Sequence, residues 1–242
     1  MSDAQPETKK PSKLKGALKA AFGKHAPWWV KVLRSTALVL TFFPAVEFGL
    51  MPNLPGRELT PGERTTIKAV FNDAVNADKI RVHTSKGMDL LVNPFAPITG
   101  NVIYGHTRGN VIIMNGEIKE ADYSKAFNDF AREAFLHESV HVWQHQHKPF
   151  DTACDFMKLS VSRQGGLEGF YSYTLAPGKD LLDYNIEQQA VIVTDYFLHV
   201  QKGEPPEYSA NTEKGAQLKA LYDGTLKNFK ENPKYISAPR PR

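Results

Sequence analysis

The chain has 242 residues, of which 41% are hydrophobic, enough to bury one substantial core. Its net charge of +4 is concentrated at the start, because residues 1–34 carry eight Lys and Arg against two acidic residues, a net +6, which leaves the other 208 residues at −2. This distribution argues against a nucleic-acid-binding domain, which spreads positive charge over a folded face. The single cysteine, Cys154, excludes an internal disulfide, and we interpret it as a packed small residue.

Residues 1–56 are predicted to precede the folded domain as a basic tail and an apolar segment. The stretch 1–26 is rich in Lys and Ala and has few large apolar groups. The stretch 27–51 contains an apolar run that Pro44 and Glu47 interrupt, which is too short for a membrane span of about 20 residues. Two interpretations of 27–51 stay open: an amphipathic helix that docks on the core, or a segment that contacts a membrane surface.

The first part of the folded domain is predicted to hold one helix and a small antiparallel sheet. A capping box at Thr60–Glu63, with proline at the first helical position, predicts a helix over 61–75. Short apolar runs punctuated by Gly, Asn and Pro predict strands at 80–84, 89–92, 101–104 and 110–114. We expect 110–114 to be either an edge strand that pairs with an extended substrate or an ordinary covered strand. The histidines in this part, His83 and His106, are interpreted as structural.

The sequence His137-Glu138-Ser139-Val140-His141 is the pattern around which the chain is organised. Two histidines four residues apart lie on one face of a helix and are able to share one metal ion. The residue between them, Glu138, then lies where a general base for a metal-bound water is needed. Apolar residues at helical spacing predict that this helix spans 122–146, without Pro or Gly, and lies partly buried. The sequence therefore predicts a zinc site with one ion per chain.

A catalytic zinc ion needs a third protein ligand. His145 and His147 follow on the same helix, but three ligands on one straight helix cannot converge tetrahedrally. Glu187 opens a second predicted helix, 185–201, on which a carboxylate among apolar residues is costly unless it is paired or bound to a metal. We therefore predict Glu187 as the third ligand; its main rival, Glu168, lies among glycines.

Three further residues are candidates for supporting roles. Asp195 is predicted to accept the second ring N–H of a ligating histidine, with a plain helix-surface carboxylate as the alternative. The long excursion 148–184 is predicted to wall the substrate cleft. Within it, Tyr171 or Tyr173 is a candidate donor to a developing oxyanion, and an ordinary aromatic role is the alternative for each.

The chain is expected to end in a helix over 211–231 and a disordered, proline-rich tail over 233–242. These predictions place one domain at 57–232. Its fold class is α+β, zincin-like and helix-rich, with the small sheet packed on the His-Glu-x-x-His helix.

The motif Leu136–Gln144, the stretch Tyr184–Ala190 and the upstream Leu59–Glu63 together resemble gluzincin-type bacterial metallopeptidase domains. They resemble most of all the toxin domains that accompany VgrG and Rhs proteins of type VI secretion systems. The resemblance covers roughly residues 57–200. It implies zinc ligands His137, His141 and Glu187, with Glu138 as the base.

The resemblance also implies a biological role. It implies a secreted antibacterial effector that cleaves a protein or peptide substrate, is delivered with a VgrG-type spike, acts in the periplasm of the target cell and has an immunity protein. Two alternatives stay open, a membrane-associated binding protein with a structural zinc site and a housekeeping zinc peptidase. No nucleic-acid partner is expected.

Overall fold

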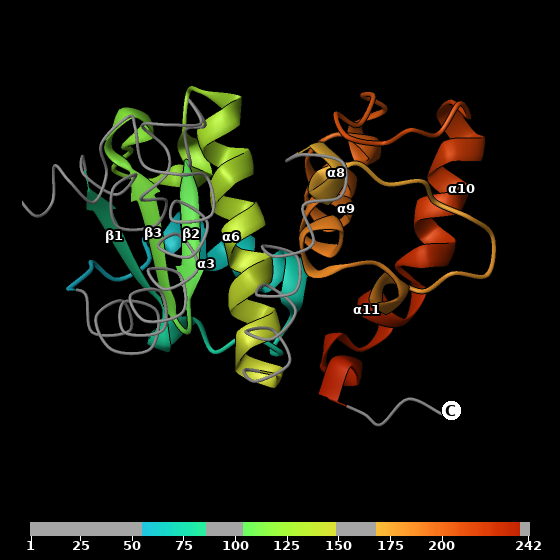
Figure 1. The fold of residues 1–242 in the computed structure, drawn as a ribbon. Helices are drawn as coiled ribbons and strands as arrows, with labels where there is room; N and C mark the ends of the chain where they lie inside the picture. The colour runs from blue at the N-terminus through green and yellow to red at the C-terminus, as the bar shows by residue number, and fades with distance from the viewer. Residues whose placement is uncertain (1–54, 86–103, 149–167, 238–242) are drawn as a thin grey trace, which may run out of the picture. The chain divides into compact units, whose positions relative to one another are not determined.

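The computed structural model of the chain describes residues 55–85, 104–148 and 168–237, and these combine helices with one small sheet (Figure 1). This α+β arrangement agrees with the sequence-based prediction. No helix in the described ranges combines the length and apolar composition that crossing a bilayer requires. The predictions for 27–51, for the strand at 89–92 and for Cys154 lie outside the described residues.

The described helices are α3 (Pro61–Phe71), α6 (Asp129–His147), α8 (Glu168–Tyr171), α9 (Ile186–Leu198), α10 (Gly215–Thr225) and α11 (Lys227–Glu231). Short 3₁₀ turns lie between and after them: η3 (Ala77–Lys79), η4 (Gly116–Ile118), η5 (Tyr123–Lys125), η6 (Leu181–Asp183), η7 (Val200–Lys202) and η8 (Pro233–Ser237).

The sheet is mixed, which corrects the expectation of an antiparallel one. Strands β1 (Arg81–Ser85), β2 (Gly105–Arg108) and β3 (Val111–Asn115) lie in the order β1-β3-β2. β3 pairs in parallel with β1 and antiparallel with β2. The stretch expected as an edge strand, 110–114, therefore forms the central strand, and all five residues of β3 are buried, as a strand covered on both faces requires.

β2 was not anticipated as a strand, because the glycines at both its ends predict turns. Gly109, with φ 58°, opens a two-residue turn to Asn110 and so joins β2 to β3 as a tight hairpin. Gly105 pairs with Met114 at the start of the strand. Of the expected strand 101–104 only Tyr104 is described, and it lies just before β2 rather than in a strand.

α3 begins where the capping box predicts, and the Glu63 carboxylate that forms the box is fully buried. It accepts two hydrogen bonds from the Arg57 guanidinium, at 2.7 and 2.8 Å, and one each from the backbone N–H groups of Thr60 and Tyr123. These partners compensate for the loss of water around a buried charge. The helix ends at Phe71, earlier than expected, because Asn72 takes a positive φ of 49°.

α6 begins at Asp129, seven residues later than predicted. The Asp122 side chain accepts hydrogen bonds from the backbone N–H and the hydroxyl of Ser124, and so caps the short turn η5 instead of a long helix. Asn128 is the true cap, since its side-chain oxygen accepts from the N–H of Phe130 at 3.0 Å. Both capping residues are good helix starters, so composition alone does not distinguish them.

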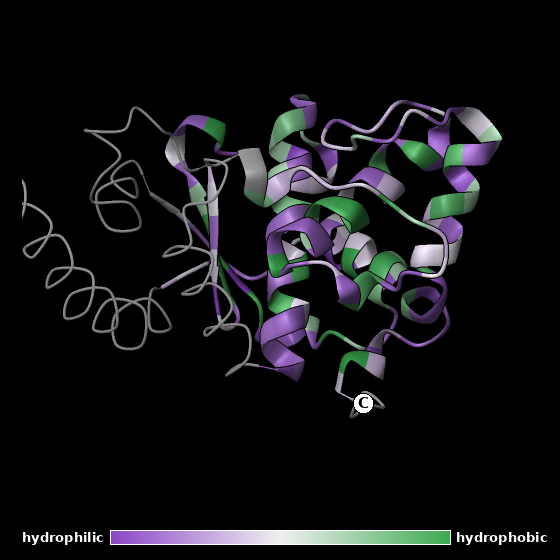
Figure 2. Cartoon of the chain, turned by 45° about the vertical axis from the view of Figure 1, so that its right-hand side comes forward, coloured by the Kyte–Doolittle hydropathy of each residue, from purple (hydrophilic) through white to green (hydrophobic). Residues whose placement is uncertain are grey.

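α6 lies between the sheet and α9 and contacts both. From Phe135 to Gln144 every residue except His137 is buried, as expected for a helix covered on two sides. Figure 2 shows hydrophobic and hydrophilic residues interspersed along the helices. The ring of Trp143 packs against Phe71 of α3 and Phe229 of α11, with centroids 6.4 and 5.1 Å away. This aromatic cluster connects α3 and α11 to α6.

The C-terminal region is more ordered than expected. The predicted helix over 211–231 is divided at Leu226 into α10 and α11. Beyond it, Pro233 and Ile236 of η8 are buried, and the carbonyl of Pro233 accepts a hydrogen bond from the Trp143 indole N–H at 2.9 Å. The folded domain therefore extends through Ser237, past the expected boundary at 232.

A buried polar cluster joins α9 to the C-terminal helices. Asp195 of α9 is 3% exposed and accepts a hydrogen bond from the Tyr173 hydroxyl, which also meets the hydroxyl of Tyr222. Burial raises the pKa of Asp195 from 3.8 to about 6, although the bond from Tyr173 opposes the shift. The folded state thus prefers the neutral carboxyl, and stability from this group is lost as the pH rises from about 4 through 6.

Replacing Asp195 by Asn should remove this pH dependence. Burial disfavours the ionised form of Asp195, which forms as the pH rises. The unfolding free energy of the wild type relative to D195N should therefore fall by about 1–3 kcal/mol between pH 4 and pH 7. Denaturant unfolding of both proteins across this range measures the difference. The exposed Asp73→Asn serves as the matched control, and a wild-type-minus-D195N difference that does not change with pH would contradict the assignment.

Candidate metal centre

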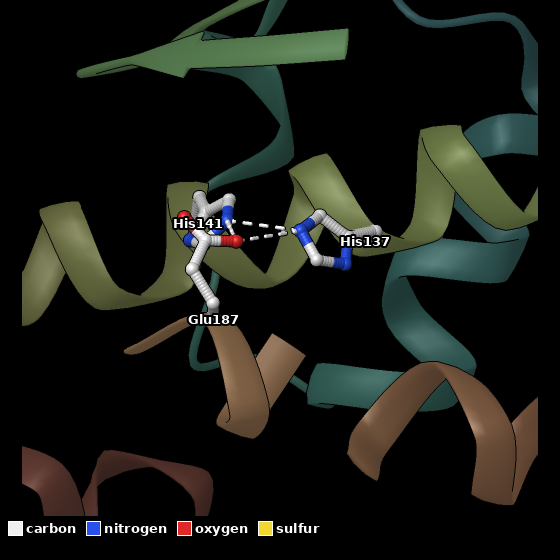
Figure 3. A group of neighbouring side chains, drawn as sticks. All are labelled: His137, His141 and Glu187. Carbon is white, nitrogen blue, oxygen red and sulfur yellow. Dashed lines mark hydrogen bonds and ion pairs between the residues drawn. The ribbon is translucent and has the colours of Figure 1, made fainter. Parts of the chain in front are cut away.

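The two histidines of the motif lie one turn apart on the same side of α6. Opposite them, α9 begins with a reciprocal cap, in which Asn185 accepts from the N–H of Gln188 at 2.9 Å and Gln188 accepts from the N–H of Asn185 at 3.3 Å. This cap fixes the first helical turn, in which Glu187 is the second residue. Figure 3 shows the two imidazoles reaching from α6 toward the carboxylate that α9 presents.

Three side-chain atoms converge at the centre of this arrangement. Oε2 of Glu187 is 3.1 Å from Nε2 of His137 and 3.2 Å from Nε2 of His141, and the two nitrogens are 3.2 Å apart. Atoms about 2.0–2.1 Å from a tetrahedral zinc ion stand about 3.3 Å apart, close to the spacing found here. These three residues are therefore able to hold one metal ion, and the described residues contain no second group of this kind.

The charges of the cluster favour a cation at its centre. Burial alone would raise the pKa of the Glu187 carboxyl, but the two imidazoles hold it well below its usual range. Burial likewise favours the neutral form of His141, but the carboxylates of Glu187 and Glu138 raise its pKa to about 9. A buried carboxylate between two imidazoles thus needs a positive charge, which either a proton or a metal ion supplies.

Glu138 lies beside this cluster, on the side of α6 that faces β2. It is 6% exposed, and its Oε2 atom has no hydrogen-bond partner. Space for the side chain depends on Gly105, because a Cβ atom there would come within 2.7 Å of Glu138 Oε1. The Thr107 hydroxyl donates to the backbone carbonyl of Glu138 at 2.8 Å and fixes β2 against this turn of α6. A buried, unpartnered carboxylate oxygen next to the three candidate ligands is suited to accepting a proton.

The second ring nitrogen of His141 has Gln144 as its hydrogen-bond partner, whereas the sequence analysis predicted Asp195. Nδ1 of His141 lies 2.8 Å from Oε1 of Gln144. The carboxylate of Asp195 instead contacts Tyr173 and the N–H of Glu207, on the side of α9 that faces the C-terminal helices. Eight residues along a helix rotate a side chain by about 80° from its starting face, which is sufficient to point Asp195 elsewhere.

The two candidate tyrosines have different surroundings. Tyr171, at the end of α8, has its ring 6.0 Å from the His137 ring, and the Glu187 carboxylate, together with burial, raises its pKa. Tyr173 is buried in the polar cluster with Asp195, which favours the alternative of an ordinary aromatic role. Of the two, Tyr171 is therefore the stronger candidate.

The other histidines considered lie outside the cluster. His147 contacts the carbonyl of Ala74 and the hydroxyl of Ser237, and His83 contacts the carbonyl of Pro55. His145 is not part of the three-residue group. Sequence reasoning missed Gln144 and Gly105, although Gln144 has a detectable signal: it follows His141 by three residues, on the same helical face.

Comparison with known proteins gives one relative and one solved structure. No family model matches the chain. An alignment of 183 residues, which covers 72% of this chain, gives 35% identity to the type VI secretion system spike protein VgrG2b of Pseudomonas aeruginosa and spans 15% of that protein's length. The solved effector domain of VgrG2b from the same organism matches with a TM-score of 0.50 and 28% identity, over 81% of this chain and 96% of that one. The chain is therefore homologous to the effector domain of VgrG2b.

Proposed function

We propose that the chain is a zinc-dependent peptidase that serves as a type VI secretion effector. The observation that carries the enzymatic part is the convergence of His137, His141 and Glu187 within 3.2 Å of one another, beside the unpartnered oxygen of Glu138. Two nitrogen ligands and one carboxylate leave a fourth position for water, which is the donor set of catalytic rather than structural zinc sites. With a helix pair and a small mixed sheet around this set, we assign the domain to the zincin-like folds.

The residues of the chain supply the rest of the reaction. Zinc at this site contributes Lewis acidity, which makes water a nucleophile near neutral pH. Glu138 takes a proton from the attacking water as the water oxygen bonds to the peptide carbonyl carbon. Glu138 then gives that proton to the amide nitrogen as the C–N bond breaks, so the base is regenerated. The hydroxyl of Tyr171 is the candidate donor to the negative oxygen formed on the carbonyl.

β2 replaces 110–114 as the proposed docking strand for an extended substrate. Among the described strands it pairs with β3 on one side only. Its first residue, Gly105, lies directly against the Glu138 side chain. A peptide that pairs by backbone hydrogen bonds with the edge that β2 forms among the described strands would pass beside the general base. A protein or peptide substrate bound in an extended form is consistent with both features.

The effector part of the proposal is supported by the homology to the VgrG2b effector domain, which covers nearly all of that domain. By this relationship we propose a VgrG-type spike as the delivery partner and the periplasm of a target cell as the place of action. A cognate immunity protein would protect the producing cell. The stretch 27–51, for which membrane contact is an open interpretation, lies outside the described residues.

Removing a ligand should remove the metal. Purified wild-type protein is expected to contain one zinc ion per chain. Loss of a residue that only supports a ligand lowers metal affinity by about 10–100-fold, so loss of a ligand in H137A or E187A should lower zinc affinity by more than about 100-fold. Elemental analysis and chelator competition measure this. H147A is the matched control, a histidine of α6 outside the cluster, and full zinc content in E187A would refute the ligand set.

Replacing Glu138 by Gln should separate metal binding from catalysis. The amide cannot take up the proton, so E138Q should keep its zinc but cleave an unfolded protein about 100–10,000-fold more slowly than the wild type. Cleavage of an unstructured protein, followed by gel with and without chelator, tests this. If the wild type binds zinc but never cleaves, the site is structural and the peptidase assignment fails.

Directing the chain to the periplasm of a susceptible bacterium tests the effector role. Wild-type protein should arrest growth there, and E138Q at equal abundance should not, because toxicity would depend on cleavage. Growth curves with matched expression levels give the comparison. Active enzyme in the periplasm without any growth defect would favour a housekeeping peptidase.

A further inference from the structure

Gln144 connects the second motif histidine to the start of α9, and the direction of each hydrogen bond in this connection is determined. The amide nitrogen of Gln189 lies 2.7 Å from the backbone carbonyl of Tyr184, which only accepts hydrogen bonds. The NH₂ group of Gln189 must therefore face Tyr184, and its oxygen must face Gln144. Nε2 of Gln144 donates to that oxygen and to the backbone carbonyl of Ile186, both at 3.0 Å.

The orientation of Gln144 in turn sets the tautomer of His141. With its NH₂ group held by Ile186 and Gln189, Gln144 directs only its oxygen toward His141, 2.8 Å from Nδ1. An amide oxygen accepts but does not donate, so Nδ1 must carry the proton. In the neutral ring the lone pair then belongs to Nε2, the atom that faces His137 and Glu187.

The same bonds fix the third ligand. Tyr184 and Ile186, whose carbonyls anchor the chain of hydrogen bonds, stand on either side of the α9 cap Asn185, and Glu187 follows immediately. Gln144 is 1% exposed and Gln189 is 7% exposed, so bulk water cannot readily replace a lost hydrogen-bond partner of either amide. A displacement of the first turn of α9 would therefore disturb the His141 tautomer and the Glu187 position together.

We propose that Gln144 is a positioning residue that prepares the metal site, by holding His141 in the Nδ1–H tautomer and by keeping the first turn of α9 in register with α6. This inference rests on the metal-binding part of the proposed function and is independent of cleavage. Supporting groups of this kind change metal affinity by about 10–100-fold. Gln144 acts through His141 and Glu187 and does not itself touch the metal position.

Zinc affinity of Q144L against Q146L tests the proposal. Gln146 is a matched control, because it lies on α6 and also bridges to other segments, through the backbone of Asn76 and the side chain of Asn110, but does not touch the cluster. Q144L should bind zinc about 10–100-fold more weakly than the wild type, and Q146L within threefold of it. Competition with a chromophoric chelator gives the affinities, and denaturant unfolding in the metal-free state gives the stability lost in each variant.

Two results would overturn the proposal while leaving the zinc site intact. The first is an affinity for Q144L within threefold of the wild type, or one no weaker than that of Q146L. The second, which needs no variant to fold, comes from ¹H–¹⁵N spectra of zinc-loaded wild type: these should show His141 protonated at Nδ1 and metal-bound at Nε2, and the opposite assignment refutes the mechanism. Failure of the wild type to bind zinc at all would overturn both this proposal and the proposed function.

Discussion

The rest of this structure depends on one interaction, in which a buried carboxylate oxygen lies between two imidazole nitrogens. Oε2 of Glu187 and the Nε2 atoms of His137 and His141 stand 3.1–3.2 Å apart, and the residues Glu187 and His141 are buried. Such a cluster is unfavourable without a positive charge at its centre. The fold maintains it by covering α6 on two faces, with the sheet on one and α9 on the other, so that side chains from two distant segments meet.

The architecture around the cluster divides the work between backbone and side chains. Backbone elements provide the coarse placement, since α6 brings two residues to one face and the cap at Asn185 fixes where α9 begins. Side chains provide the fine adjustment, through the contact of Gln144 with His141 and the absence of a side chain at Gly105. Glu138 is thereby left buried yet with a free oxygen, a condition that a close-packed interior rarely permits.

Much of the site could be predicted from the sequence, because its main residues follow local rules. The spacing of His137 and His141 is a property of any helix, and Glu187 was identifiable as a charge among apolar residues. The mixed sheet, the role of Gly105 and the partner of His141 depend instead on which elements meet in three dimensions. Asp195 shows the limit well: its position on α9 is compatible with supporting a ligand, and only the packing of α10 against α9 reveals that it serves a different cluster.

The separation of the three clustered residues along the chain has a mechanical consequence. His141 and Glu187 are 46 residues apart, and they belong to helices that otherwise meet through packing and a few buried amides. An ion shared by these residues would act as a reversible cross-link that closes this loop and restricts the unfolded chain. The one cysteine offers no covalent substitute, so the same ion that activates water would also tie the sheet-bearing half of the domain to its helical half.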